Sequence, residues 1–139
     1  MVIHTFGAVF GLATSWMLGP KGAHDSKKVS TNYYSNMIGS IGTIFLWMYW
    51  PSFTAGLSTG GTRERIVINT VMSLGTSCIG AYGSSQLLNH GLFKMEDIMN
   101  ATLAGGVVIG SVCDLANDFW IPMTLGLFIG AYSSWGFNV

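Results

Sequence analysis

Long apolar stretches alternate with short polar ones along this chain of 139 residues. The charged side chains gather in a few short places, and five apolar stretches lie between and beside them. These stretches are Met1–Gly19, about Tyr33–Leu57, Ile66–Leu88, Ile98–Val112 and Phe119–Val139. Most approach the roughly 20 residues with which a helix crosses a hydrocarbon core. The pattern predicts five membrane-crossing helices, of which the fourth is short unless it extends through Asp114 to Asn117.

Helices are favoured over strands for a physical reason. The five stretches do not alternate apolar and polar residues, as the strands of membrane barrels do. In lipid, each backbone polar group must find its partner inside the protein, and a helix satisfies its own. Met1–Gly19 lacks the positive start of a signal peptide, so it is assigned as a helix too. The expected fold class is an all-α integral membrane protein with about five transmembrane helices.

Composition narrows the function classes. Half of the residues are hydrophobic and 9% are charged, against about 25% in ordinary soluble domains. The formal net charge is zero and no basic patch favours nucleic acid. Cys78 and Cys113 stand far apart in apolar runs, and no metal-ligand or nucleotide-loop spacing occurs. Asp114 and Asp118 have no evident catalytic partner. We therefore expect no cofactor, no metal and no enzymatic activity.

Glycine pairs indicate how the helices pack. Four G-x-x-x-G pairs place two small residues on one helix face, where another backbone can approach closely. They are Gly7/Gly11, Gly56/Gly60, Gly106/Gly110 and Gly126/Gly130. The second pair falls at the turn that contains "LSTGGT", residues 57–62, and indicates flexibility. The other three predict close helix contacts in a compact bundle.

Lys and Arg set the expected orientation. Lys21, Lys27, Lys28 and Lys94 fall on one side of the alternating helices, and Arg63 and Arg65 fall on the other. The side with more positive charge faces the cytoplasm in most membrane proteins. We therefore expect Lys27 and Lys94 to face the cytoplasm and Arg63 to face outside.

Two features inside the apolar stretches are candidates for chemistry. His4 is the one histidine within such a stretch, whereas His24 and His90 lie in loops. A polar residue at membrane depth is costly, which favours a function, although a helix-end histidine bonded to a carbonyl is an equal alternative. The run "FLWMYWPSF", residues 45–53, gathers aromatic rings around Pro51, which frees a backbone carbonyl. Such rings form either an interfacial belt, the role expected for Trp16, Trp120 and Trp135, or the lining of a cavity.

The motifs resemble a known family. In order and spacing, "IHTFGAVFGL" from Ile3, "IGTIFLWMYWPSF" from Ile41, "INTVMSLGTS" from Ile68 and "NATLAGGVVIGSV" from Asn100 look like the Rh glycoprotein branch of the ammonium transporter family. The tail "GLFIGAYSSWGF" resembles the helix that follows. The resemblance covers the whole chain, and "LWMYWPSF" and "NATLAGGV" are its most specific parts.

The resemblance implies a function. Members of this family form trimers in which each subunit of eleven or twelve helices holds its own pore. Ammonium enters an outer vestibule and loses its proton, and neutral ammonia then passes two pore histidines. His4 matches the first of these histidines, Phe53 matches a phenylalanine of the outer gate, and Trp50 matches an aromatic residue near the vestibule. The implied partners are ammonia or ammonium, the lipid bilayer and family members in a homo- or hetero-trimer, and the expected location is the plasma membrane.

The chain also departs from the family pattern. Thr54 stands where the family usually has Asn after the gate phenylalanine. The family's aspartate upstream of the first histidine and the helix with the second histidine have no counterpart here. Residues 1–139 thus resemble the central helices of a partial ammonium transporter domain. The alternatives are a non-conducting Rh-type scaffold, a truncated inactive copy or an unrelated small membrane protein, but retention of His4 favours the channel lineage.

These departures generate a prediction for the chain by itself. We expect that the 139 residues alone do not conduct ammonia, because a pore wall from one part of the bundle meets lipid where its partner helices would lie. Stopped-flow alkalinisation of vesicles that contain the purified chain measures this. Entry of ammonia clearly faster than into empty vesicles, and lost in His4→Leu, would mean that the short chain builds a pore by self-association.

Overall fold

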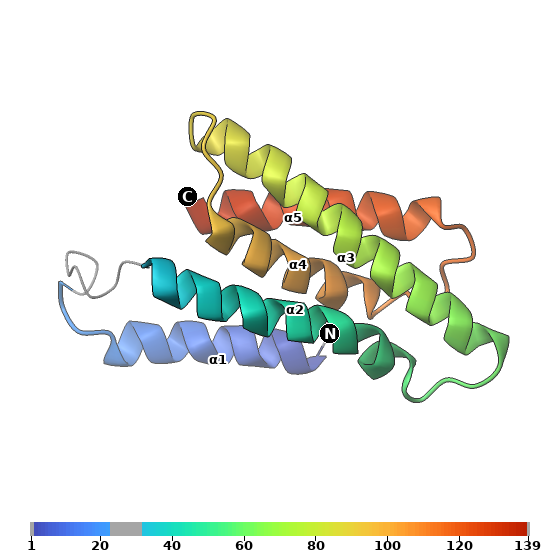
Figure 1. The fold of residues 1–139 in the computed structure, drawn as a ribbon. Helices are drawn as coiled ribbons and strands as arrows, with labels where there is room; N and C mark the ends of the chain where they lie inside the picture. Colours follow the sequence, from blue (N-terminus) through green and yellow to red (C-terminus); the bar gives the residue numbers. More distant parts are fainter. Residues whose placement is uncertain (1, 23–31, 139) are drawn as a thin grey trace.

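The fold is a bundle of helices. The computed structural model describes residues 2–22 and 32–138, and these residues form five α-helices and no strand. The helices are α1 (Val2–Leu18), α2 (Tyr33–Ala55), α3 (Gly61–Leu88), α4 (Met95–Ile109) and α5 (Trp120–Asn138). Figure 1 shows α3, α4 and α5 packed together, with α2 beside α4 and α1 on the outside. The five predicted helices are confirmed, each near its expected place.

The predicted start of the third helix was wrong. The third helix begins at Gly61 and not at Ile66, so its first turns carry the charged residues Arg63, Glu64 and Arg65. The sequence pattern places these residues before the third apolar stretch, because charged side chains interrupt an apolar pattern without ending a helix. Gly60, with φ of 64°, precedes the helix in a conformation that glycine adopts without strain.

The fourth helix is short, and it does not extend through Asp114 to Asn117. It ends at Ile109, and residues 110–115 form turns. Side chains of α3 replace the helical hydrogen bonds there. Asn69 Nδ2 donates to the carbonyls of Cys113, at 3.0 Å, and Ala116, at 2.8 Å. Arg65 donates to the carbonyl of Asp114 at 2.8 Å. The chain after α4 can therefore be non-helical and still have its backbone groups paired.

The centre of the bundle is built from small residues. A methyl group added at Gly126 would overlap the Ser73 carbonyl oxygen of α3, and one added at Gly130 would overlap that of Ser77. Gly80 of α3 in turn faces the carbonyl of Leu127. The backbones of α3 and α5 thus lie in direct contact, as the glycine spacing of α5 predicted.

The other glycine pairs behave differently. Gly106 of α4 lies against α2, as expected for a contact position, and Gly110 lies near Thr54. Gly7 and Gly11 of α1 have no atom within 4 Å that an added methyl would meet, so their predicted contact is not made within the described residues. Gly56 and Gly60 flank the turn between α2 and α3, where they were expected.

The outer surface is apolar. No described residue of α1 is buried, and large side chains such as Phe6, Trp16 and Phe128 are mostly exposed. Among the described helices, α3 combines the length and hydropathy needed to cross a membrane, and α1 is apolar but shorter. An exterior of this kind over most of a protein is costly in water and compatible with lipid. The arrangement is that of an integral membrane bundle.

The helix ends alternate between two sides. In Figure 1 the end of α3, the start of α4 and the C-terminus lie at one end of the bundle, and the start of α3, the end of α4 and the N-terminus lie at the other. Lys94 is at the first end and Arg63 at the second. Lys27 and Lys28 lie outside the described residues. The arrangement agrees with the alternation assumed in the orientation argument, whose membrane sides stay a prediction.

The contact between α3 and α5 generates a stability prediction. Gly130→Ala places a methyl group on the carbonyl oxygen of Ser77, which belongs to a helix backbone and cannot rotate away. We expect the free energy of unfolding to fall by about 1–3 kcal/mol, measured by denaturant titration in bicelles with helical circular dichroism. Gly83→Ala, which meets nothing within 4 Å, is the matched control and should be neutral or stabilising. Equal stability of the two variants would contradict close packing at Gly130.

Orientation can be tested with single cysteines. In a background with Cys78 and Cys113 replaced by serine, an impermeant thiol reagent added outside should label Thr62→Cys and leave Leu92→Cys unlabelled. Both positions are exposed and lie near opposite ends of α3. The reverse labelling pattern would invert the orientation derived from Lys and Arg.

Candidate functional site

The structure brings the three predicted site residues together. His4 comes from the start of α1, and Trp50 and Phe53 come from the last turns of α2. The rings of His4 and Trp50 are stacked, with centroids 6.4 Å apart and planes 26° apart. Trp50 and Phe53 meet edge to face at 6.3 Å. Residues far apart in the chain thus form one aromatic cluster.

This cluster lines an open recess of about 600 Å³. Besides the three aromatic residues, its walls are formed by residues of α1, the end of α2 and the last turn of α4: Val2, Ile3, Thr54, Gly106, Val107 and Gly110. No Asp, Glu, Lys or Arg lines the recess, so it offers no counter-charge to an ion. His4 supplies its one imidazole, a group able to donate or accept a hydrogen bond.

The local sequence of α2 explains how its aromatic residues are presented. Trp50 and Phe53 are three positions apart and so lie on one helix face. Pro51 between them is buried within the helix. Trp47, one turn before Trp50, points elsewhere. It lines a second cavity of about 310 Å³ between α2, α3 and α4. Trp47 and Trp50 therefore line different cavities, whereas Phe45 and Tyr49 of the same run are mostly exposed.

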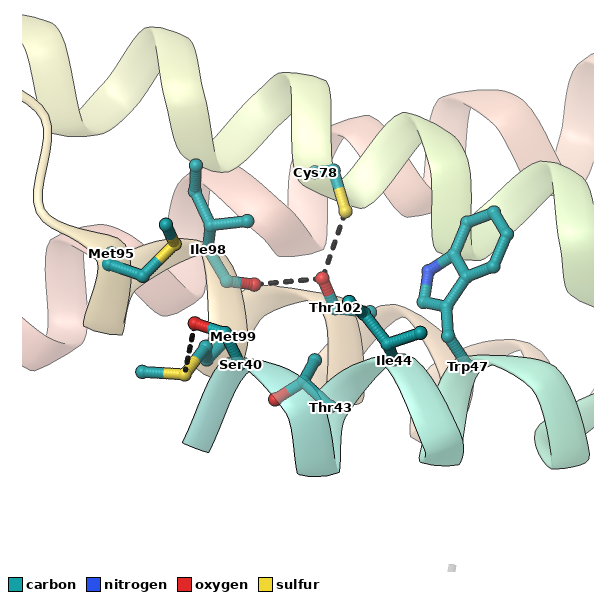
Figure 2. Close-up of a pocket in the computed structure, with 9 residues that line it drawn as sticks. All are labelled: Ser40, Thr43, Ile44, Trp47, Cys78, Met95, Ile98, Met99 and Thr102. Atoms are coloured by element: carbon teal, nitrogen blue, oxygen red, sulfur yellow. Dashed lines mark hydrogen bonds between the residues drawn. The ribbon is translucent and has the colours of Figure 1, made fainter. Parts of the chain in front are cut away.

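The second cavity has no polar surface of its own. In Figure 2, Trp47 lies at one end and Met95 at the other. Its hydroxyl groups are occupied inside the protein: Thr102 Oγ1 lies 2.9 Å from Cys78 Sγ, and Ser40 Oγ donates to the carbonyl of Asn36 at 2.7 Å. The cavity is thus an apolar space between three helices.

Thr54 is bonded within the bundle. Its hydroxyl lies 2.9 Å from the Thr70 hydroxyl of α3, and it also lies within donating distance of the Trp50 and Pro51 carbonyls, at 3.2 and 3.1 Å. Thr70 in turn donates to the carbonyl of Ile66 at 2.7 Å. Because Thr70 uses its own hydrogen for Ile66, Thr54 donates to the Thr70 hydroxyl and thus ties the end of α2 to α3. Thr54 therefore has a local structural role that does not require the asparagine side chain usual at this position in the family that the sequence resembles.

The indole nitrogen of Trp50 is unusual. Nε1 is buried and has no hydrogen-bond partner among the described residues. Trp50 lies against Gly106 of α4, where an added methyl would overlap the ring atoms Cε2 and Nε1. A buried donor without a partner costs about 1–3 kcal/mol. Packing therefore holds the ring in this position, and no hydrogen bond of Nε1 to a described residue sets its orientation.

One buried carboxylate was missed by sequence reasoning. Asp97 directly precedes the predicted apolar stretch Ile98–Val112, yet it lies in the first turn of α4 and is fully buried. Ser85 Oγ donates to Asp97 Oδ2 at 2.5 Å, and Asn138 Nδ2 donates to Oδ1 at 2.9 Å. The group joins the ends of α3, α4 and α5 on the side of the bundle away from the recess. The signal available in the sequence was the acidic residue at a helix start followed by an apolar run.

The structure gives no indication of a metal centre in the part of the chain it describes. Within residues 2–22 and 32–138, no three His, Cys, Asp or Glu side chains gather in a way that could hold an ion. His90 lies in the turn between α3 and α4 with φ of 54°. His24, the third histidine, lies outside the described residues. The recess around His4 is thus the one site where a predicted functional histidine meets a cavity.

Comparison with known proteins places this geometry in context. The model of the Ammonium Transporter Family matches residues 1–139. The chain is similar to ammonium transporter Rh type C of Canis lupus familiaris, with 42% identity over 140 residues that cover 99% of the chain and 30% of that relative. It is also similar to ammonium transporter Rh type A of Rattus norvegicus, with 40% identity over 141 residues, 99% of the chain and 31% of that relative.

A solved structure shows the same arrangement of helices. The Nitrosomonas europaea Rh50 structure, described with the mechanism of conduction by the Rhesus protein family of channels, superposes with a TM-score of 0.89 at 33% identity. The match covers 97% of this chain and 35% of the Rh50 chain. The chain therefore spans about a third of the length of the proteins it matches.

Proposed function

Because the chain belongs to the ammonium transporter family, we propose that it forms one wall of a path for ammonia across a membrane. The observation that carries this proposal is the recess of about 600 Å³ in which His4, Trp50 and Phe53 meet. Their positions in two different helices match the positions that the motifs assigned to a pore histidine, a vestibule aromatic and a gate. The recess opens beside α1, the helix least packed against the rest.

Physical chemistry favours the neutral form of the permeant. A full charge near the centre of a bilayer is costly, by an amount that ranges from a few to more than ten kcal/mol. Ammonia carries no charge, and loss of the proton at the pore mouth removes most of that cost. Within an uncharged recess, the His4 imidazole exchanges a hydrogen bond with the guest in place of water. The phenyl ring of Phe53 lines the recess and offers no hydrogen-bond partner to a hydrated cation.

Three further features belong to the proposal. The working unit is a homo- or hetero-trimer with family members, because the exposed apolar faces of the described helices need helices or lipid beside them. The membrane is the plasma membrane. Transport is the activity, and no catalytic conversion of ammonia takes place beyond gain and loss of a proton.

His4→Leu tests the proposal. The substitution replaces the one imidazole of the recess with an apolar side chain of similar size, which cannot hydrogen-bond to ammonia. Ammonia flux should therefore fall by about tenfold, which corresponds to a barrier higher by about 1.4 kcal/mol. The measurement is stopped-flow alkalinisation of proteoliposomes with the complete protein that contains these residues. Trimer content, followed by size-exclusion chromatography, should be unchanged.

The matched control is Trp16→Leu on the same helix, because Trp16 is 89% exposed and does not line the recess. Its flux should equal that of the unmodified protein. An unchanged flux in His4→Leu at normal trimer content would remove His4 from the path. Absence of ammonia flux in the unmodified protein would instead favour the Rh-type scaffold.

A further inference from the structure

Two neighbouring glycines of α4 face different parts of the bundle. At Gly105, an added methyl would overlap the Ser77 side chain and would lie 3.0 Å from the carbonyl oxygen of Ser73, both in α3. At Gly106, the three atoms nearest to an added methyl all belong to the indole ring of Trp50. Gly105 thus allows α4 to approach a helix, whereas Gly106 accommodates one aromatic side chain.

The indole ring forms a link between α4 and α1. Its pyrrole part rests on Gly106, while the ring as a whole stacks on His4 at 6.4 Å and meets Phe53 at 6.3 Å. No described residue of α1 is buried, so this helix has little other packing to hold it in place. The position of His4 relative to the bundle therefore depends on where the Trp50 ring lies.

The position of the Trp50 indole ring is determined by packing and not by a hydrogen bond. Nε1 is buried against α4 without an acceptor among the described residues. A tryptophan side chain without steric constraint would orient its N–H toward a hydrogen-bond acceptor or toward water. Space above Gly106 is the feature that lets the ring lie flat against α4 and leaves the recess open between α1 and α4.

We propose that Gly106 is a positioning residue for the ammonia path: it seats Trp50 on α4, and Trp50 in turn holds His4 and Phe53 at the recess. This inference rests on the proposed function and adds to it a residue of a third helix. A side chain at position 106 would push the rigid indole away from α4. The ring would then move into the recess, fill part of it and displace His4.

The substitution Gly106→Ala tests this, with two matched controls. Gly105→Ala also crowds a buried contact of α4, but at α3 and not at Trp50. Gly42→Ala adds a methyl to α2, the helix of Trp50, where nothing lies within 4 Å. The complete protein is labelled with 5-fluorotryptophan, the Trp50 resonance is assigned by its loss in Trp50→Leu, and ammonia flux is measured in parallel.

In Gly106→Ala we expect the Trp50 fluorine resonance to shift and ammonia flux to fall by about tenfold, with a thermal midpoint no lower than that of Gly105→Ala. Neither control should shift the Trp50 resonance. In a Trp50→Leu background, Gly106→Ala should cause no further loss of flux, because the two residues then act as one unit.

An unmoved Trp50 resonance in Gly106→Ala, or an equal shift in Gly105→Ala, would overturn the inference. An additive loss of flux in the double variant would also overturn it, since Gly106 would then act independently of Trp50. Failure of the proposed function gives a different result. The unmodified protein would conduct no ammonia, while the fluorine spectra would still report whether Gly106 seats the ring.

Discussion

The direct contact between the backbones of α3 and α5 is the constraint on which the rest of the bundle depends. It exists because Gly126 and Gly130 have no side chains where they meet the carbonyls of Ser73 and Ser77. In lipid, an apolar side chain gains little by leaving its solvent, so helices associate through close van der Waals contact and hydrogen bonds. The buried side of α3 is accordingly built from small and hydroxylated residues, and its serines and threonines return hydrogen bonds to nearby carbonyls.

This central pair fixes the neighbouring elements in turn. Ser73 donates to the carbonyl of Gly105 at 3.1 Å, which places α4 against α3. Once α4 is in place, Gly106 provides the surface on which Trp50 of α2 rests. Trp50 then carries His4 of α1 by stacking. The candidate site is thus connected to the core by a series of contacts. The innermost contact joins the backbones of α3 and α5, and the outermost is the stacking of the Trp50 and His4 rings.

The sequence predicted the helices because apolar stretches of helix length are a local signal. It also singled out His4, Trp50 and Phe53, which the structure brings together, but their role stays a prediction. The boundaries at Arg65 and Asp97 were not predictable in the same way, because a charged side chain inside a helix depends on a partner far along the chain. For Arg65 that partner is Asn117, whose side-chain oxygen lies 2.7 Å away. The roles of Gly105 and Gly106 could not be separated either, since adjacent positions point to different neighbours only after the bundle is assembled.

The buried carboxylate of Asp97 has a consequence for how the chain enters a membrane. The apolar part of α4 is short, and it begins beside an acidic group that is costly in hydrocarbon on its own. Its hydrogen-bond donors are Ser85, near the end of the preceding helix, and Asn138, at the end of the following one. We therefore expect α4 to be stable in lipid once α3 supplies the Ser85 donor, with α5 supplying the second donor. On this view the three helices enter the membrane as a cooperative group, and the order of synthesis provides the first donor before the carboxyl group and the second after it.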